Sequence, residues 1–142
     1  MKYIDSFSIA SFKQEEDYIL ERRKTKADMT CYSNSIYPFN IFTWKKLHTI
    51  EFENITIICG GNGCGKSTLL NIIAEKLGVM RRSPFNYTPY YEDYLKLCSA
   101  ELTFGRRLPE TSRIITSDDV FDFLLDIRSL NVAIDRRRED LF

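Results

Sequence analysis

A glycine-rich turn, set between a run of β-branched residues and an apolar helical stripe, constrains the fold of this chain most. Residues 60–68 form the turn and read Gly-Gly-Asn-Gly-Cys-Gly-Lys-Ser-Thr. Residues 55–59 before it are mostly β-branched and do not alternate with polar residues, which is typical of a central strand covered on both faces. Residues 66–78 after it carry apolar side chains at helical spacing and end in glycine. The predicted local order is buried strand, tight loop and buried helix, as in an α/β protein.

The turn matches the pattern G-x-x-x-x-G-K-[ST] of a phosphate-binding, or Walker A, loop. Glycines allow the backbone to turn tightly and approach a ligand, and successive N–H groups then point at the phosphates. Lys66 can reach the β- and γ-phosphates, Ser67 can complete the shell of a Mg²⁺ ion, and Thr68 can bond another phosphate oxygen. We therefore expect ATP and Mg²⁺ as cofactors. The expected nucleotide-binding residues are Gly60, Gly61, Asn62, Gly63, Cys64, Gly65, Lys66, Ser67 and Thr68.

The alternative is a glycine-rich turn that binds nothing. A random chain of this length would match the pattern about 0.005 times. A lysine without an anion partner would also be unfavourable at the positive end of a helix. Both points favour phosphate binding.

Length, charge and cysteine content limit the classes of protein to which this chain can belong. The 142 residues suffice for one domain with a core. The 20 basic and 20 acidic residues give no net charge, which argues against a surface wholly devoted to nucleic acid but leaves local patches open. No apolar run is long enough to cross a bilayer, and the N-terminus lacks the apolar segment of a secretory signal, so we expect a cytoplasmic protein with no membrane partner. The four cysteines, with a single histidine, form no zinc pattern, and we expect free thiols.

The other elements are expected from local patterns. Strands are predicted at residues 2–10, 48–52, 102–104 and 113–116. A short helix is predicted within residues 88–98, and a longer one after the cap at residues 117–119. The charged stretch at residues 13–28 fits either a hairpin with a solvated turn or a loop.

Residues 62–70, Asn-Gly-Cys-Gly-Lys-Ser-Thr-Leu-Leu, resemble the loop of the ATP-binding-cassette (ABC) type of P-loop ATPase. The leader at residues 50–58, which runs straight into the loop, resembles the chromosome-maintenance (SMC) and RecF-like branch. More closely, the chain resembles the start of bacterial AAA family predicted ATPases with an ABC-like core. The resemblance implies a partial P-loop fold of ABC-ATPase type, with a mixed sheet, antiparallel leader strands and a P-loop helix.

Such ATPases continue with motifs that this chain does not show. The apolar run at residues 123–126 ends in Asp126, but Ile127 follows instead of a second acid, and the run lies in a helical pattern. The single histidine, His48, precedes the loop in the sequence, whereas the switch histidine of such ATPases follows it. We therefore expect residues 1–142 to form the N-terminal lobe of the ATPase domain, which binds ATP without hydrolysing it alone. A second copy or a partner would supply the missing half, and DNA binding stays open.

Two other functions compete with this interpretation. One is a different P-loop phosphotransferase, such as a small kinase, although the form of the loop and the strand-rich leader argue against it. The other is a non-catalytic, nucleotide-dependent interaction module.

Further contacts are suggested by position in the family. Ser117 and Asp118 fall where the family has a Gln loop, and we expect them either to contact Mg²⁺ or its water, or to cap a helix. In cassette ATPases the adenine stacks on an aromatic residue upstream of the loop. The candidates are Tyr37, Phe39, Phe42 and Trp44, with core packing as the alternative for each.

Overall fold

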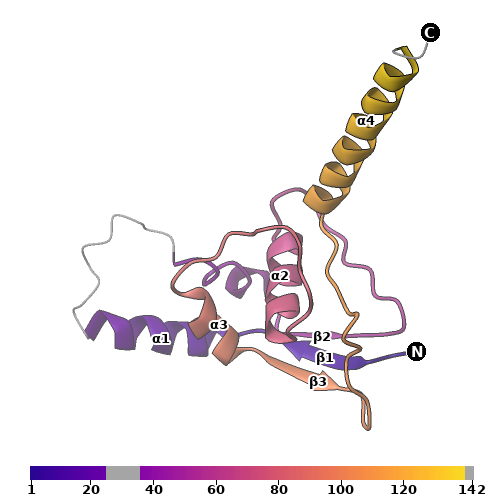
Figure 1. Ribbon diagram of the computed structural model, residues 1–142. Helices are drawn as coiled ribbons and strands as arrows, with labels where there is room; N and C mark the ends of the chain where they lie inside the picture. Colours follow the sequence, from indigo (N-terminus) through magenta and orange to yellow (C-terminus); the bar gives the residue numbers. More distant parts are fainter. Residues whose placement is uncertain (25–35, 140–142) are drawn as a thin grey trace.

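The computed structural model describes residues 1–24 and 36–139 (Figure 1). In this part of the chain the elements run in the order β1 (Ile4–Ser8), α1 (Phe12–Lys24), the 3₁₀ turn η1 (Thr43–Lys45), β2 (Thr49–Glu51), α2 (Lys66–Lys76), α3 (Tyr91–Leu97), β3 (Ser99–Leu102) and α4 (Ser117–Glu139).

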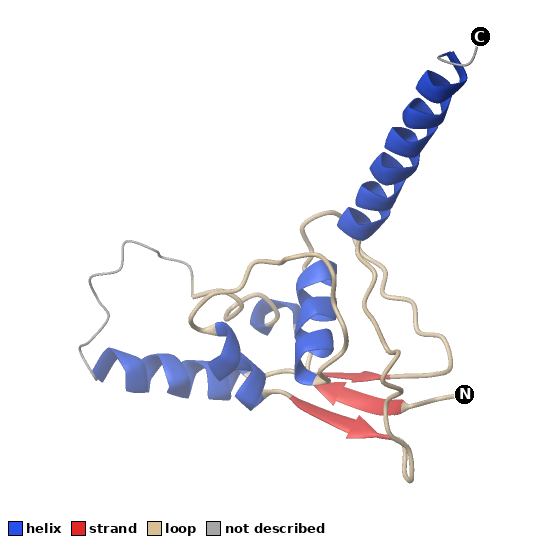
Figure 2. Ribbon diagram, viewed as in Figure 1, coloured by secondary structure: helices blue, strands red, loops and turns tan. Residues whose placement is uncertain are grey.

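The sheet is antiparallel and has β1 at its centre, in the order β2-β1-β3 (Figure 2). Phe7 lies opposite Ile50 on one side and Ala100 on the other. The strands predicted at residues 2–10 and 48–52 are confirmed as the shorter β1 and β2, whereas the third strand begins earlier than predicted, at Ser99. The antiparallel leader strands are thus confirmed. The prediction of a mixed sheet is wrong for the described residues, where the parallel pairing is a single bridge between Met80 and Arg113.

The largest correction concerns residues 55–59, which form no strand. Ile57 is 79% exposed, and Ile55 is similarly exposed. A strand covered on both faces needs neighbouring strands for its backbone groups, and the described residues supply none for this segment. β-branched side chains favour a strand only where such neighbours exist. The same reason reduces the predicted strand at residues 113–116 to the bridge at Arg113.

The charged stretch that was expected to form a hairpin or a loop is a helix, α1, as far as Lys24. Residues 25–28 of the stretch lie outside the described residues. The helix starts with a capping box, in which the Ser11 N–H donates to Gln14 Oε1 (2.9 Å) and the Gln14 N–H donates to Ser11 Oγ (3.4 Å). These two bonds satisfy backbone donors that the first helical turn leaves free.

The helix after the glycine-rich turn is confirmed as α2. Its buried side includes Leu69, Ile72 and Ile73, whereas Leu70, which the predicted stripe included, is exposed. The helix ends in a Schellman motif, because Gly78 (φ +62°) donates to the carbonyl of Glu75 (3.2 Å) and Val79 donates to that of Ala74 (2.9 Å).

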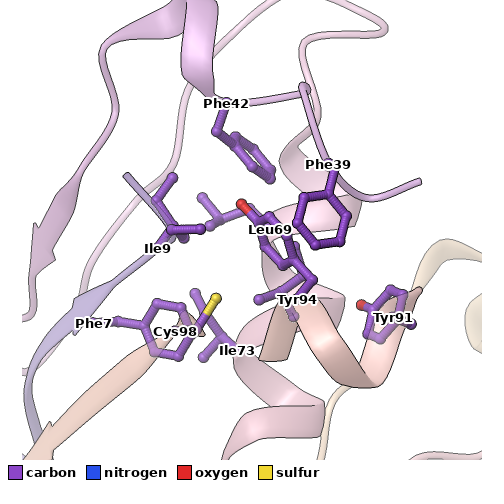
Figure 3. Packing of buried hydrophobic residues seen from close by; sticks show 11 residues of the cluster. Phe7, Ile9, Phe39, Phe42, Leu69, Ile73, Tyr91, Tyr94 and Cys98 are labelled. Carbon is purple, nitrogen blue, oxygen red and sulfur yellow. The ribbon is translucent and has the colours of Figure 1, made fainter. Parts of the chain in front are cut away.

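The core gathers side chains from β1, α2, α3 and the segment before η1 (Figure 3). Phe39 packs edge-on against Tyr94 at 4.9 Å between ring centroids, and stacks on Tyr18 at 4.6 Å. Such aromatic pairs contribute about 0.5–1.5 kcal/mol each beyond the area they bury. Burial also raises the pKa of the Cys98 thiol to about 11. Cys98 is a free thiol, as are Cys59 and Cys64, whereas Cys31 lies outside the described residues.

The last helix, α4, projects away from the other elements (Figure 1). Phe123 is 59% exposed, and most of the other apolar side chains of α4 are exposed as well. The predicted helix is therefore confirmed, and most of its apolar side chains are exposed rather than packed against the core. Among the described residues, no helix has the apolar length that a bilayer crossing requires.

Candidate phosphate-binding loop

Two glycines give the loop its tight turn into α2. Gly65 precedes the first residue of the helix and has φ +91°, and Gly63 has φ +74°. Side chains with a Cβ rarely adopt this left-handed backbone conformation, so glycine is favoured at both positions. The helix then starts directly at Lys66, and the carbonyl of Gly65 accepts its first backbone bond, from Leu69 at 2.9 Å.

Close packing also favours glycine at two positions of the loop. A Cβ at Gly65 would lie 3.2 Å from Ile41 Cγ2 and 3.3 Å from Phe42 Cε1. A Cβ at Gly60 would lie 2.6 Å from the Sγ of Cys64, which is too close for any real contact. The segment that leads into η1 therefore supports the loop from one side.

The side chain of Lys66 folds back over the loop that precedes it. Its Nζ donates to the carbonyl oxygens of Gly60 (2.6 Å) and Gly61 (2.8 Å), and it lies 3.5 Å from the Sγ of Cys64. The ammonium group is thus held at the turn by these two carbonyl oxygens.

The start of α2 presents backbone donors beside this ammonium. Within the described part of the chain, the backbone N–H groups of Lys66, Ser67 and Thr68 have no hydrogen-bond acceptor. These groups carry the partial positive charge of the helix N-terminus, which favours an anion. In the same turn Ser67 is exposed and Thr68 is half-buried.

A groove of about 410 Å³ borders the loop, a volume typical of a small-molecule site. None of the described residues that line it is acidic. Its lining consists of Phe42, Lys45, Leu47, Ile50, Thr56, Ile57, Ile58, Cys59, Gly60, Cys64, Gly65, Lys66 and Leu69.

A second ammonium, that of Lys45, contacts the loop, and no sequence motif pointed to it. Its Nζ donates to the carbonyl of Cys64. The turn that carries Lys45 is anchored by the buried carboxylate of Glu15, whose Oε2 accepts from the backbone N–H of Asn40 (2.8 Å) and from Thr43 Oγ1 (2.7 Å). No sequence spacing links these residues to the loop, because the fold alone brings them together.

The structure does not bring Ser117 and Asp118 to the loop. Both are exposed in the first turn of α4, and no hydrogen bond or ion pair of the described residues joins them to residues 60–68. The helix is capped one residue earlier than predicted, because Asp119 Oδ2 accepts from the Thr116 N–H (2.7 Å) and Thr116 Oγ1 accepts from the Asp119 N–H (3.5 Å). Among the described residues, no cluster of three or more acidic, histidine or cysteine side chains could hold a metal ion.

The aromatic candidates for the adenine separate into two groups. Phe39 and Phe42 are buried in the core, as the packing alternative predicted, and Tyr37 is half-buried with its ring 6.0 Å from that of Tyr91. Trp44 is instead 81% exposed, in the same turn as Lys45.

A family model matches the part of the chain that contains the loop. Residues 35–77, less than a third of the chain, match the family model of an AAA domain. This is an AAA/P-loop ATPase-like region. The match covers η1, β2, the glycine-rich loop and α2, and it suggests a nucleotide-binding, ATPase-like function. ATPases of this family generally use a nucleotide and Mg²⁺. No curated protein and no solved structure matches the chain.

Proposed function

We propose that residues 60–68 bind the polyphosphate of ATP, and that the chain is the nucleotide-gripping lobe of an ABC-type (SMC/RecF-like) ATPase. One observation carries this proposal. The Lys66 ammonium is held at the glycine turn, and the acceptor-free N–H groups at the start of α2 follow directly on that turn, inside the region that matches an AAA domain. A polyphosphate is the ligand whose charge and oxygen geometry such a turn complements.

Each part of the loop has a role in this proposal. Gly60, Gly61, Asn62, Gly63, Cys64 and Gly65 would supply the backbone cradle. Lys66 would exchange its neutral carbonyl acceptors for anionic phosphate oxygens, which form stronger hydrogen bonds. Ser67 would offer its hydroxyl to Mg²⁺, and Thr68 would bond a phosphate oxygen. Contacts of Ser117 and Asp118 with Mg²⁺ stay a prediction.

The lining of the groove supports binding without hydrolysis by these residues alone. A carboxylate that activates water or holds Mg²⁺ is needed for efficient hydrolysis, and none of the described lining residues is acidic. We propose that a second copy of the chain or a partner supplies this group. The exposed apolar residues at positions 55 and 57, and those of α4, support a further packing partner, because large exposed apolar patches usually mark interaction surfaces.

Titration calorimetry with ATP and Mg²⁺ tests the proposal. The wild-type chain is expected to bind, and Lys66→Met is expected to weaken binding by about 10- to 100-fold, because one charge-assisted bond contributes about 1.5–3 kcal/mol. Lys13→Met, at an exposed position of α1, is the matched control and is expected to leave affinity unchanged. Equal affinity in the wild type and Lys66→Met would exclude the loop as the binding site.

The non-catalytic interaction module remains the second candidate, and the acid-free groove together with the exposed apolar face of α4 favours it. This function requires ATP to change the association state of the chain. Sedimentation velocity with and without Mg·ATP tests this requirement, and an unchanged mass would exclude self-association driven by ATP. Because a second copy could also supply the catalytic group, an ATP turnover assay of the associated form then separates the two functions.

A further inference from the structure

We propose that Lys45 is a second phosphate-contacting cation, which acts with Lys66 on the same polyphosphate chain. The inference rests on the proposed function and adds a residue that lies outside the glycine-rich motif. Its basis is the placement of two ammonium groups on one loop.

Both ammonium groups contact the same residue of the loop. Lys45 Nζ donates to the carbonyl of Cys64, and Lys66 Nζ lies 3.5 Å from the Sγ of Cys64. Lys45 Nζ is also 3.6 Å from the position that a Cβ on Gly65 would occupy. The two lysines therefore flank the turn and line the same groove.

The electrostatics of this arrangement point to an anion. Two like charges on one turn repel each other, and the acceptors that face them are neutral carbonyl oxygens and a sulfur atom. Neither lysine forms an ion pair within the described residues. A triphosphate carries several negative charges along a short chain, so it would neutralise both ammonium groups at once.

The position of Lys45 is set by the fold rather than by chance exposure. Its backbone N–H donates to the carbonyl of Phe42 (2.9 Å), and Phe42 is buried in the core. Thr43, two residues earlier, donates to the buried carboxylate of Glu15 at 2.7 Å. The backbone of η1 is thus fixed on two sides, and the lysine side chain extends from it to the loop.

The neighbouring residue provides a matched control. Lys46 is exposed, and the described residues give it no hydrogen bond or ion pair. Lys45→Met and Lys46→Met therefore remove the same charge one position apart. Lys45→Arg keeps the charge, and Lys45→Gln is a second neutral variant should the methionine variant fold poorly in a thermal unfolding scan.

The experiment measures dissociation constants for Mg·ATP and for inorganic tripolyphosphate by calorimetry. A change in the fluorescence of Trp44, the single tryptophan, is the second readout. We expect Lys45→Met to weaken both ligands by about tenfold, and Lys46→Met to change either by less than about twofold. Lys45→Arg is expected to stay within about threefold of the wild type.

Three results would overturn the inference. Wild-type affinity for tripolyphosphate in both neutral Lys45 variants would remove Lys45 from the site. Equal losses of affinity at positions 45 and 46 would reduce the effect to general surface charge. Weaker ATP binding with unchanged tripolyphosphate binding in the Lys45 variants would mean that Lys45 contacts the nucleoside and not the phosphates. If ATP binds and Lys66→Met weakens binding while both neutral Lys45 variants keep wild-type affinity, this inference fails alone. If the wild type does not bind ATP, the proposed function fails with it.

Discussion

Helices α2 and α4 both follow from clear helical patterns of apolar residues, yet only α2 packs into the core. Leu69, Ile72 and Ile73 of α2 are buried against β1 and α3, whereas Phe123 and most other apolar residues of α4 are exposed. A periodic sequence therefore determines that a helix forms, but the burial of its apolar side depends on what other parts of the chain supply.

The strands give the same contrast. β1 is paired along both edges and carries the fully buried Phe7. Residues 55–59 have an even stronger β-branched composition but no neighbour in the described residues, and they remain without regular structure. The packed lobe thus differs from residues 55–59 and α4 in the neighbouring elements that are present, and not in the local propensity for strand or helix.

Removal of an aromatic ring should distinguish the packed core from α4 by the largest difference in stability. Phe7→Ala is expected to lower the free energy of unfolding by about 3–5 kcal/mol, because Phe7 is fully buried. The same change at the exposed Phe123 of α4 is expected to cost less than about 0.5 kcal/mol. Urea unfolding of both variants measures the difference. Similar decreases in the two variants would mean that α4 packs as tightly as the core.

Loss of the buried carboxylate that anchors η1 should have the next largest effect. Glu15→Gln weakens the bonds from Asn40 and Thr43, and it is expected to cost about 1–3 kcal/mol of unfolding free energy. Glu16→Gln changes an exposed neighbour and is expected to cost almost nothing. Urea midpoints compare the two, and an unchanged midpoint for Glu15→Gln would show that η1 is not held by this carboxylate.

Removal of α4 should have a small effect on the packed lobe. A chain that ends at Ile115 is expected to unfold with a free energy lower by about 1 kcal/mol or less, because the truncation chiefly breaks the hydrogen bond that Asp119 accepts from Ser83 (2.5 Å). The measurement is cooperative urea unfolding of the shortened chain. If the shortened chain unfolds without a cooperative transition, the packed lobe depends on α4 for its stability, and the account is wrong on this point.

The smallest effect is expected from acid. The bonds from Ser83 and Thr116 lower the pKa of Asp119 to about 2, so its stabilising contribution is complete above the ordinary carboxyl pKa, near 4, and is lost as the pH falls towards 2. The protection of the amides in the first turn of α4 against hydrogen exchange, relative to the intrinsic exchange rate at each pH, should therefore fall over this pH range in the wild type. Asp119→Asn should show this low protection already at neutral pH. The same pH dependence of protection in the wild type and in Asp119→Asn would show that Asp119 does not stabilise this turn.

The sequence predicted the elements whose determinants are local. The glycine-rich turn, α2 with its glycine stop at Gly78, and the strands β1 and β2 were all expected within a few residues. The helix α1 could also have been found, because Ser11 and Gln14 form a capping-box pattern at its start. The high charge of that stretch masked the signal.

Other features depend on contacts between distant residues and left no local signal. The exposure of residues 55–59 depends on missing strand neighbours, and the position of Lys45 depends on the buried Glu15. The cap of α4 at Thr116 was misplaced by one residue, because Ser117 is by type at least as good a capping residue as Thr116.

A crystal structure of the chain with Mg²⁺ and a non-hydrolysable ATP analogue tests the central claim most directly. Our account predicts the polyphosphate against the start of α2, with Lys66 Nζ moved from the carbonyl oxygens of Gly60 and Gly61 to phosphate oxygens. A nucleotide bound elsewhere, with Lys66 still on those two carbonyl oxygens, would contradict the account.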